Sequence, residues 1–238
     1  MAEQGVLYMI PCPISDSTAV YDVVPQSNAK VVDGLDYFIV ENVRSARRFL
    51  SKCGISRKID ELEFVELNEH TVAGAAVEAM IKPILQGRSA GVISEAGVPG
   101  VADPGALVVE ACHRKGIRVV PLVGPSSILL AMMASGLNGQ SFAFNGYLPV
   151  KPPERAKALK NLERRAHQEH QSQIFIEAPY RNVKLAEQIF SVCGAETQLT
   201  IACDITSPEE LIVTRSVASW RKSGIPDIAK RPTIFIIG

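Results

Sequence analysis

The segment Val92–Gly105 has the composition of a ligand-binding loop. It starts as the end of an apolar strand, continues through Ser-Glu-Ala-Gly-Val-Pro-Gly-Val-Ala, and enters a helix at Asp103-Pro104. In open α/β sheets, ligands bind in loops of this kind, at the carboxyl ends of the strands. A tight turn between a strand and a helix would have the same composition, so the loop alone leaves both interpretations open.

A second loop, Gly124-Pro125-Ser126-Ser127, precedes an apolar helix that we expect over residues 128–135. The N–H groups at the start of a helix can bind a carboxylate. The two serines can equally serve as ordinary N-caps. The helix is apolar on most of its sides, which predicts that it is largely buried.

Basic side chains gather in the predicted helix 151–168, which starts with a pair of prolines. They are Lys151, Arg155, Lys157, Lys160, Arg164 and Arg165, against the acids Glu154 and Glu163. A solvated helix is the ordinary interpretation. A strip that binds RNA phosphates is the alternative, because this is the only concentrated basic patch in a neutral sequence. His167 and His170 are spaced like a metal pair, but no third ligand lies near them in the sequence, so we expect no metal.

The composition limits the partners that the chain can have. In 238 residues, 25 Lys and Arg balance 25 Asp and Glu, so an RNA or a membrane would have to bind a local patch. The N-terminal stretch lacks a basic region, and the most apolar run, residues 128–134, is too short to span a bilayer. We therefore expect a cytoplasmic protein with no membrane partner. The five cysteines are scattered without a Cys-x-x-Cys pair, which predicts reduced thiols.

Strands alternate with helices in the first half of the chain, which favours a mostly parallel sheet. The strands are expected at residues 5–10, 36–40, 63–67, 90–94 and 117–122. One helix of this half contains Pro83, which should kink it or end it near Lys82.

The pattern changes at the second loop, which predicts an α/β protein of two domains, 1–123 and 124–238. The second domain should contain a mixed sheet with antiparallel pairs. Its strands are expected at residues 141–146, 172–176, 199–203, 210–214 and 233–237.

Six short motifs, spread in collinear order over nearly the whole chain, resemble those of one known family. They are Gly5-x-Leu7-Tyr8, Glu41-Asn42-Val43-Arg44, Asn68-Glu69-His70, Ser94–Pro99 with Asp103–Gly105, Pro121–Ser127 and Phe175–Arg181. The family is that of the tetrapyrrole-methylase-like, S-adenosylmethionine-dependent methyltransferases. Within it, the chain looks most like the branch that methylates a cytidine ribose 2′-hydroxyl in small-subunit ribosomal RNA.

The resemblance implies two α/β domains with a cleft between them, S-adenosyl-L-methionine bound in that cleft, and a homodimer that needs no metal. It assigns cofactor contacts, several of them through backbone atoms, to Val98, Val101, Ser126, Ser127, Ala178 and Thr233. A ribose hydroxyl acceptor benefits from a proton acceptor, and arginine can bind phosphate. By motif position, the candidate catalytic residues are Glu41, Arg44, His70 and Arg181.

Two segments depart from the family pattern. Cys12–Asp16 stands where the family has Thr-Pro-Ile-Gly-Asn, and Cys203–Glu210 lacks an arginine and a lysine of the family's Arg-Glu-Leu-Thr-Lys. Both segments are expected to face the substrate, so three functions stay open. The leading one is methylation of ribosomal RNA on a ribose oxygen. The alternatives are methylation of a tetrapyrrole or another small molecule, and cofactor binding without catalysis.

Overall fold

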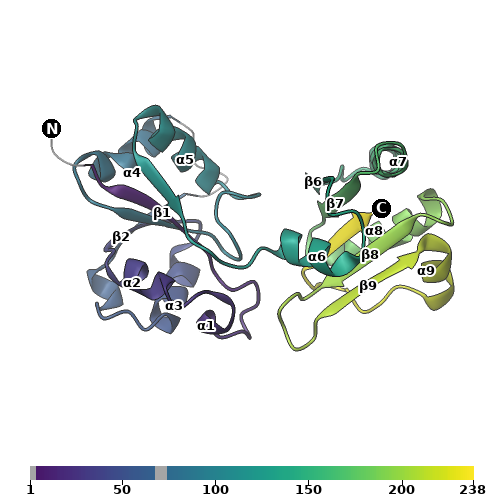
Figure 1. The fold of residues 1–238 in the computed structure, drawn as a ribbon, viewed down its shortest axis with the longest axis horizontal. Helices are drawn as coiled ribbons and strands as arrows, with labels where there is room; N and C mark the ends of the chain where they lie inside the picture. The colour runs from purple at the N-terminus through teal and green to yellow at the C-terminus, as the bar shows by residue number, and fades with distance from the viewer. Residues whose placement is uncertain (1–3, 68–73) are drawn as a thin grey trace. The chain divides into compact units, whose positions relative to one another are not determined.

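The structure, a computed structural model, describes residues 4–67 and 74–238. The chain divides into two compact units, Met1–Ser126 and Ser127–Gly238, each with its own sheet (Figure 1). We call them the N-terminal and the C-terminal unit. The domain boundary expected from the sequence, after residue 123, lies just before the division between the units.

The N-terminal unit contains a five-stranded sheet in the order β3-β2-β4-β1-β5. The strands are β1 (Val6–Ile10), β2 (Tyr37–Val40), β3 (Glu63–Glu66), β4 (Ala90–Ile93) and β5 (Arg118–Pro121). Every neighbouring pair is parallel, as the alternation of strands and helices predicted. The carboxyl ends of all five strands therefore lie along one edge of the sheet.

Helices cover both faces of this sheet because its central strands are apolar at successive positions. Phe38 and Val40 pack with the cluster that includes α3, whereas Tyr37 and Ile39 pack with the cluster that includes α4 and α5. The helices of the unit are α1 (Val20–Val23), α2 (Asn28–Asp33), α3 (Val43–Lys52), η1 (Ile59–Glu61), α4 (Ala75–Leu85) and α5 (Gly105–Arg114).

The expectation that a helix ends near Lys82 is wrong, because α4 continues through Pro83 to Leu85. Pro83 lies in the last turn of the helix, and because it has no N–H, the turn lacks one hydrogen bond to the carbonyl four residues earlier. The fully buried side chains of Ile81 and Ile84 hold that turn against the sheet. Burial of these two side chains offsets the loss of the hydrogen bond.

The C-terminal unit contains a mixed sheet in the order β6-β7-β10-β8-β9. The strands are β6 (Phe142–Tyr147), β7 (Ser172–Ile176), β8 (Gln198–Cys203), β9 (Leu211–Ser216) and β10 (Thr233–Ile237). Only β6 and β7 run parallel, and the other neighbouring pairs are antiparallel. The carboxyl ends of β6, β7 and β8 and the amino end of β10 therefore share one edge.

Helix α6 (Ser127–Ser135) packs on one face of the mixed sheet, where Ala131 and Met132 join the buried side chains of Ile174 and Ile234. The other face is covered by α7 (Pro152–Gln168), α8 (Asn182–Val192) and α9 (Val217–Ser223). Helix α9, for which the sequence analysis made no prediction, places the buried Trp220 against this face. Among the described residues, no helix combines the length and the apolarity that crossing a membrane requires.

Candidate functional site

Three loops meet at the carboxyl edge of the N-terminal sheet, following β1, β2 and β4. The N–H of Cys12 donates to the carbonyl of Gly97 at 2.8 Å, which joins the loop after β1 to the loop after β4. The N–H of Glu95 donates to the Glu41 carboxylate at 3.3 Å, which joins the same loop to the end of β2. The sheet order brings these loops together because β4 lies between β1 and β2.

The loop after β4 is shaped by residues with positive φ and by one carboxylate. Gly97 and Gly100 have φ angles of 71° and 82°, which glycine adopts without strain. The Asp103 carboxylate accepts hydrogen bonds from the N–H groups of Gly100 at 2.9 Å and Gly105 at 2.7 Å. Asp103 thus closes the loop onto the start of α5, as an acid at the beginning of a helix should.

Val98 and Val101 have the properties that a contact through backbone atoms requires. Their N–H groups donate to no acceptor in the part of the chain that the structure describes, and the Val101 side chain is half exposed. An unused N–H in an accessible loop can bind a ligand acceptor without displacing an internal bond. Both residues were predicted as cofactor contacts from the resemblance.

The second loop packs directly against the first strand's loop. A Cβ atom on Gly124 would lie 2.2 Å from Cγ of Pro11, so only glycine fits at this position. Ser126 therefore lies at the same edge of the sheet, whereas Ser127 begins α6 in the C-terminal unit. The two serines, adjacent in sequence, belong to different units.

Glu41 lies in an acidic environment. Burial, together with the nearby carboxylates of Asp103 and Glu95, raises the pKa of Glu41 above its ordinary value. The Ser45 hydroxyl donates to the Glu95 carboxylate from the first turn of α3. Arg44 is exposed, and its guanidinium forms no hydrogen bond or ion pair with residues 4–67 or 74–238. The structure thus brings Glu41 together with two other acids, and it leaves Arg44 exposed to solvent.

A small pocket of about 40 Å³ opens between the loops after β1 and β4. The charged residues that line it are Asp16, Glu95, Arg48 and Lys52, and Arg48 forms an ion pair of 3.4 Å with Asp16. Asp16 belongs to the first of the two segments that depart from the family pattern. The departure therefore places a carboxylate beside two basic side chains of α3, at the crevice where open α/β sheets bind ligands.

At the corresponding edge of the C-terminal sheet, a buried glutamate organises the turn after β7. One oxygen of the fully buried Glu177 carboxylate accepts from the N–H of Ala178 at 2.8 Å. The same oxygen accepts from Arg181, with Nε at 2.9 Å and Nη2 at 2.6 Å. The second oxygen has no hydrogen bond and lies 3.8 Å from Nη1 of Arg155, itself buried. Two guanidinium groups thus surround one carboxylate at the position of the predicted cofactor contact Ala178.

The turn after β7 is joined to the segment that leads into β10. The N–H of Lys230 donates to the carbonyl of Pro179 at 3.1 Å, and the Asn182 amide donates to the carbonyl of Arg231 at 2.6 Å. The Thr233 hydroxyl donates to the same carbonyl at 3.0 Å. Ala178 and Thr233 therefore lie at the same edge of the C-terminal sheet. This arrangement is compatible with contacts of both residues to one ligand.

The second departing segment, between β8 and β9, binds an arginine from elsewhere in the chain. Arg231 donates from Nε to Asp204 at 2.6 Å and from Nη2 to the carbonyl of Glu209 at 2.7 Å. The family's arginine and lysine are absent from this segment, and a guanidinium is nevertheless present beside it. Arg231 forms ion pairs with the carboxylates of Asp204 and, at 3.9 Å from Nη1, of Asp227, so its positive charge is neutralised.

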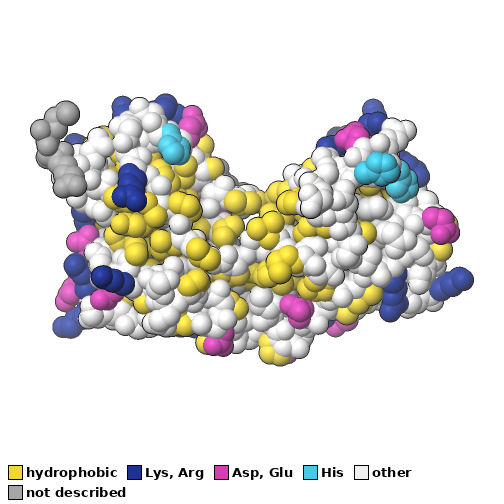
Figure 2. Space-filling view, in the orientation of Figure 1, with side chains coloured by type: hydrophobic (Ala, Val, Ile, Leu, Met, Phe, Trp, Pro, Cys, Tyr) yellow, Lys and Arg dark blue, Asp and Glu magenta, His cyan; other side chains and the backbone are white. Residues whose placement is uncertain are grey.

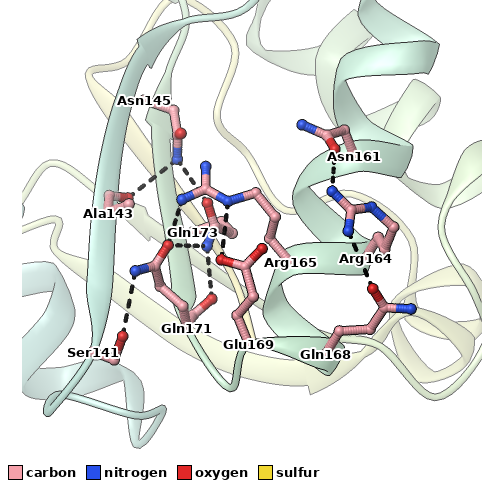
Figure 3. A network of polar contacts seen from close by, with 10 residues as sticks. All are labelled: Ser141, Ala143, Asn145, Asn161, Arg164, Arg165, Gln168, Glu169, Gln171 and Gln173. Carbon is pink, nitrogen blue, oxygen red and sulfur yellow. Dashed lines mark hydrogen bonds and ion pairs between the residues drawn. The ribbon is translucent and has the colours of Figure 1, made fainter.

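Helix α7 carries the basic residues less uniformly than the sequence suggested. Arg155 is buried against Glu177 and does not belong to a surface strip. Figure 3 shows Arg164 bonded to side chains of its own helix, whereas Arg165 donates to Gln171 before β7. On the face drawn in Figure 2, basic and acidic side chains are interspersed in both units. The exposed cations that could bind phosphate on α7 include Lys157, Lys160 and Arg164.

The remaining predictions have mixed outcomes. His70 lies outside the described residues. His170 lies beyond the end of α7, with a positive φ of 49°, so it is not spaced along a helix with His167. Within the described part of the chain, no group of three or more His, Cys, Asp or Glu side chains could hold a metal ion.

Arg155 was predicted to belong to a surface strip, but its spacing in the sequence already indicated burial. Arg155 falls on the stripe of Leu159, Leu162 and Ala166, the residues of α7 that face the core. A charged residue in such a stripe indicates a buried partner. The sequence did not indicate which partner, because Glu177 follows a different strand.

Comparison with known proteins identifies relatives over most of the chain. Residues 27–219 match the family model described as "Tetrapyrrole (Corrin/Porphyrin) Methylases". The "Ribosomal RNA small subunit methyltransferase I" of Xylella fastidiosa (strain Temecula1) is 30% identical over 237 residues, covering 100% of this chain and 82% of the relative. The protein of the same name from Escherichia coli O157:H7 is 31% identical over 209 residues, covering 88% of this chain and 68% of the relative.

Solved structures share the fold at lower identity. A diphthine synthase superposes with a TM-score of 0.66 at 14% identity, covering 98% of this chain and 89% of that one. The methyltransferase CobJ superposes with a TM-score of 0.63 at 19% identity, covering 98% of this chain and 94% of that one. The predicted α/β fold, with a parallel and a mixed sheet, is confirmed by these matches.

Proposed function

The chain belongs to the tetrapyrrole (corrin/porphyrin) methylases and is a methyltransferase, and on this premise we propose that it methylates a ribose 2′-hydroxyl of small-subunit ribosomal RNA. The observation that carries the substrate class is the pair of relatives named for small-subunit ribosomal RNA, at 30% and 31% identity over 100% and 88% of this chain. The tetrapyrrole alternative has weaker support, since the CobJ likeness at 19% identity concerns the fold alone.

The proposed cofactor is S-adenosyl-L-methionine, which supplies an already activated methyl group. The free N–H groups of Val98 and Val101 suit the acceptor atoms of this cofactor, and Val101 offers an exposed apolar side chain. Ala178 and Thr233 are the proposed contacts from the C-terminal unit, and Ser126 and Ser127 those from the loop before α6. Holding the acceptor in line with the methyl group is the main contribution that such a site makes to the rate.

Glu41 is the proposed acceptor of the hydroxyl proton. Its raised pKa makes it a better base than an ordinary surface carboxylate, since the ideal pKa of a base lies close to the working pH. Arg44 lies in the first turn of α3, and its exposed guanidinium is the proposed partner of a substrate phosphate. His70 remains a candidate by motif position. Arg181 is assigned a positioning role instead, because its guanidinium is bonded to the buried Glu177.

The experiment is incubation with S-adenosylmethionine carrying a labelled methyl group. The acceptors offered are small ribosomal subunits that lack the modification, total RNA, and a tetrapyrrole such as uroporphyrinogen. We expect label in the small-subunit RNA at one nucleotide whose 3′ linkage becomes resistant to alkali, the signature of a methylated 2′-hydroxyl. If only the tetrapyrrole is labelled, the proposal of an RNA substrate is wrong and that of a tetrapyrrole substrate takes its place. Binding of the cofactor without any labelled acceptor would favour the non-catalytic alternative.

Two further properties follow from a ribosomal substrate and from the resemblance. A protein that acts on ribosomal subunits works in the cytoplasm, which is the proposed location. The homodimer rests on the resemblance alone, and sedimentation velocity would check it: a monomer at micromolar concentration would remove it.

A further inference from the structure

Tyr180 is an exposed aromatic residue at a turn that is otherwise held rigidly. It follows Ala178-Pro179 in the turn after β7 and keeps 69% of its surface exposed. A single exposed aromatic residue is ordinary on a protein surface, so what distinguishes Tyr180 is how its ring is held.

The ring of Tyr180 is held by a chain of contacts that ends in the core. Nη1 of Arg181 donates to the Tyr180 hydroxyl at 2.8 Å, and the guanidinium carbon lies 5.0 Å from the ring centroid. Arg181 is held in turn by the two bonds to Glu177, whose side chain is fully buried. An aromatic side chain that is already oriented loses little conformational entropy when a ligand stacks on it.

The electrostatic surroundings of the ring favour a nucleotide over an apolar ligand. Arg155, Glu177 and Arg181 together carry one net positive charge, because two guanidinium groups share one carboxylate. A ring next to a net positive charge suits a base whose backbone is anionic. Unpaired bases of RNA are recognised by stacking on aromatic side chains and on arginine, which is the combination present here.

We propose that Tyr180 is a stacking surface for one unpaired nucleobase of the substrate RNA. This inference rests on the proposed function and adds a specificity-determining residue to it. The site takes a single-stranded or flipped-out nucleotide, because a base inside a duplex has no free face. Stacking tolerates any base, so Tyr180 selects an unpaired conformation and not a particular sequence.

The test measures binding of a fluorescein-labelled single-stranded RNA of about 12 nucleotides by anisotropy. A matched oligonucleotide of the same length, in which every base is removed, is the second probe. Tyr180→Leu should weaken binding of the RNA about tenfold, the loss expected for one stacked base. It should leave binding of the abasic probe unchanged. Tyr180→Phe keeps the ring and should lose less than about threefold.

Phe142→Leu is the matched control. Phe142 is also exposed, at 39%, but it lies at the start of β6, on the opposite edge of the same sheet. This variant should bind both probes like the wild type. Fluorescence of Trp220, buried in the same unit, reports whether each variant is folded.

The outcomes separate the two proposals. If the wild type methylates ribosomal RNA and Tyr180→Leu binds the RNA probe as tightly, the stacking inference is overturned and the proposed function stands. Equal losses for Tyr180→Phe and Tyr180→Leu would also overturn it, since the ring would then not be the group that binds. If the wild type neither binds RNA nor methylates it, the proposed function itself fails.

Discussion

Glu41 and Glu177 are the same residue type in the same local setting, and the structure gives them opposite surroundings. Each follows the end of a strand that is buried or nearly so, and each has an arginine a few residues later in the sequence. Glu41 lies beside the acids Asp103 and Glu95. Glu177 lies between the guanidinium groups of Arg155 and Arg181.

The difference separates a proposed proton acceptor from a carboxylate that holds a turn. Burial, and to a smaller degree the neighbouring carboxylates, raise the pKa of Glu41 and so strengthen its hold on a proton. The Glu177 carboxylate is the shared partner of two guanidinium groups, and removing it would leave the buried Arg155 without a counter-charge. The proposed proton acceptor thus lies in the N-terminal unit, whereas the carboxylate that holds the turn after β7 lies in the C-terminal unit.

The largest expected effect is on stability, from Glu177→Gln. The substitution keeps the shape of the side chain but leaves the buried guanidinium of Arg155 without its counter-charge, which should cost about 3 kcal/mol of unfolding free energy. Urea unfolding followed by Trp220 fluorescence measures the C-terminal unit specifically, because the chain contains one tryptophan.

Glu41→Gln is the matched control for this measurement. It makes the same chemical change in the N-terminal unit and should leave the Trp220 transition where it is in the wild type. A Glu177→Gln protein with an unchanged midpoint would contradict the structural role assigned to Glu177.

A smaller effect is expected from Gly97→Val, which tests the backbone of the N-terminal edge. A β-branched residue at φ 71° is strained by about 1–2 kcal/mol. Because the loop would relax away from its ligand-binding conformation, S-adenosylmethionine should bind about tenfold more weakly. Isothermal titration calorimetry measures this.

The control for this substitution is Gly139→Val. Gly139 is in the C-terminal unit, where an added Cβ would meet no atom within 4 Å and no positive φ is required. Its affinity for the cofactor should equal that of the wild type. If the Gly97→Val protein binds S-adenosylmethionine as tightly as the wild type, the proposal that the loop after β4 contacts the cofactor is wrong.

The pH dependence of stability should distinguish Glu41 from an ordinary glutamate. Its pKa in the folded protein is raised, so the folded state binds the proton more tightly than the unfolded state does. The stabilisation is complete below the ordinary pKa of 4.5 and is lost as the pH rises through the raised value. Hydrogen exchange of β2 and β4 amides, measured across this range, reports the N-terminal unit.

The Glu41→Gln protein should lack this loss and should be the more stable of the two at neutral pH. At a pH below 4.5 the two proteins should be equally stable. Identical pH profiles would mean that neither burial nor the neighbouring acids raise the pKa of Glu41 in the folded protein.

The smallest effect on stability is expected from replacing Lys157, Lys160 and Arg164 together with alanine. These side chains are exposed, and the buried Glu163 that pairs with Lys160 keeps its hydrogen bonds from Thr197 and from the N–H of Gly194 when Lys160 is replaced. The variant should nevertheless bind RNA with a flatter salt dependence, since each lost phosphate contact lowers the slope by about 0.7. Anisotropy titrations at several salt concentrations measure that slope.

Arg155→Met sharpens the distinction within α7. This change should lower the stability of the C-terminal unit and leave the salt slope of RNA binding unchanged, because Arg155 is buried. If the salt dependence of RNA binding is unchanged in the triple variant, α7 does not bind phosphate and is an ordinary solvated helix.

Much of the fold follows from local patterns in the sequence. The strands are short apolar segments that end at glycine, proline or a charged residue, and the alternation with helices predicts the parallel sheet of the N-terminal unit. Helix α4 was misjudged near its end because the buried side chains of Ile81 and Ile84, which hold the turn after Pro83, act through tertiary packing. Helix α9 was not predicted for the same reason, since only Val217 and Trp220 face the core.

The sequence by itself determined which residues belong to the loops at the two sheet edges, because glycine, proline and capping acids act within a few residues of themselves. Tertiary structure alone decided which charges that are distant in the sequence meet. Glu41 reaches Glu95 and Asp103 because β2 is the neighbour of β4, and Arg155 reaches Glu177 because α7 packs across β7. Charge interactions depend on distance in space, and strand order, which sets that distance, is not a local property of the chain.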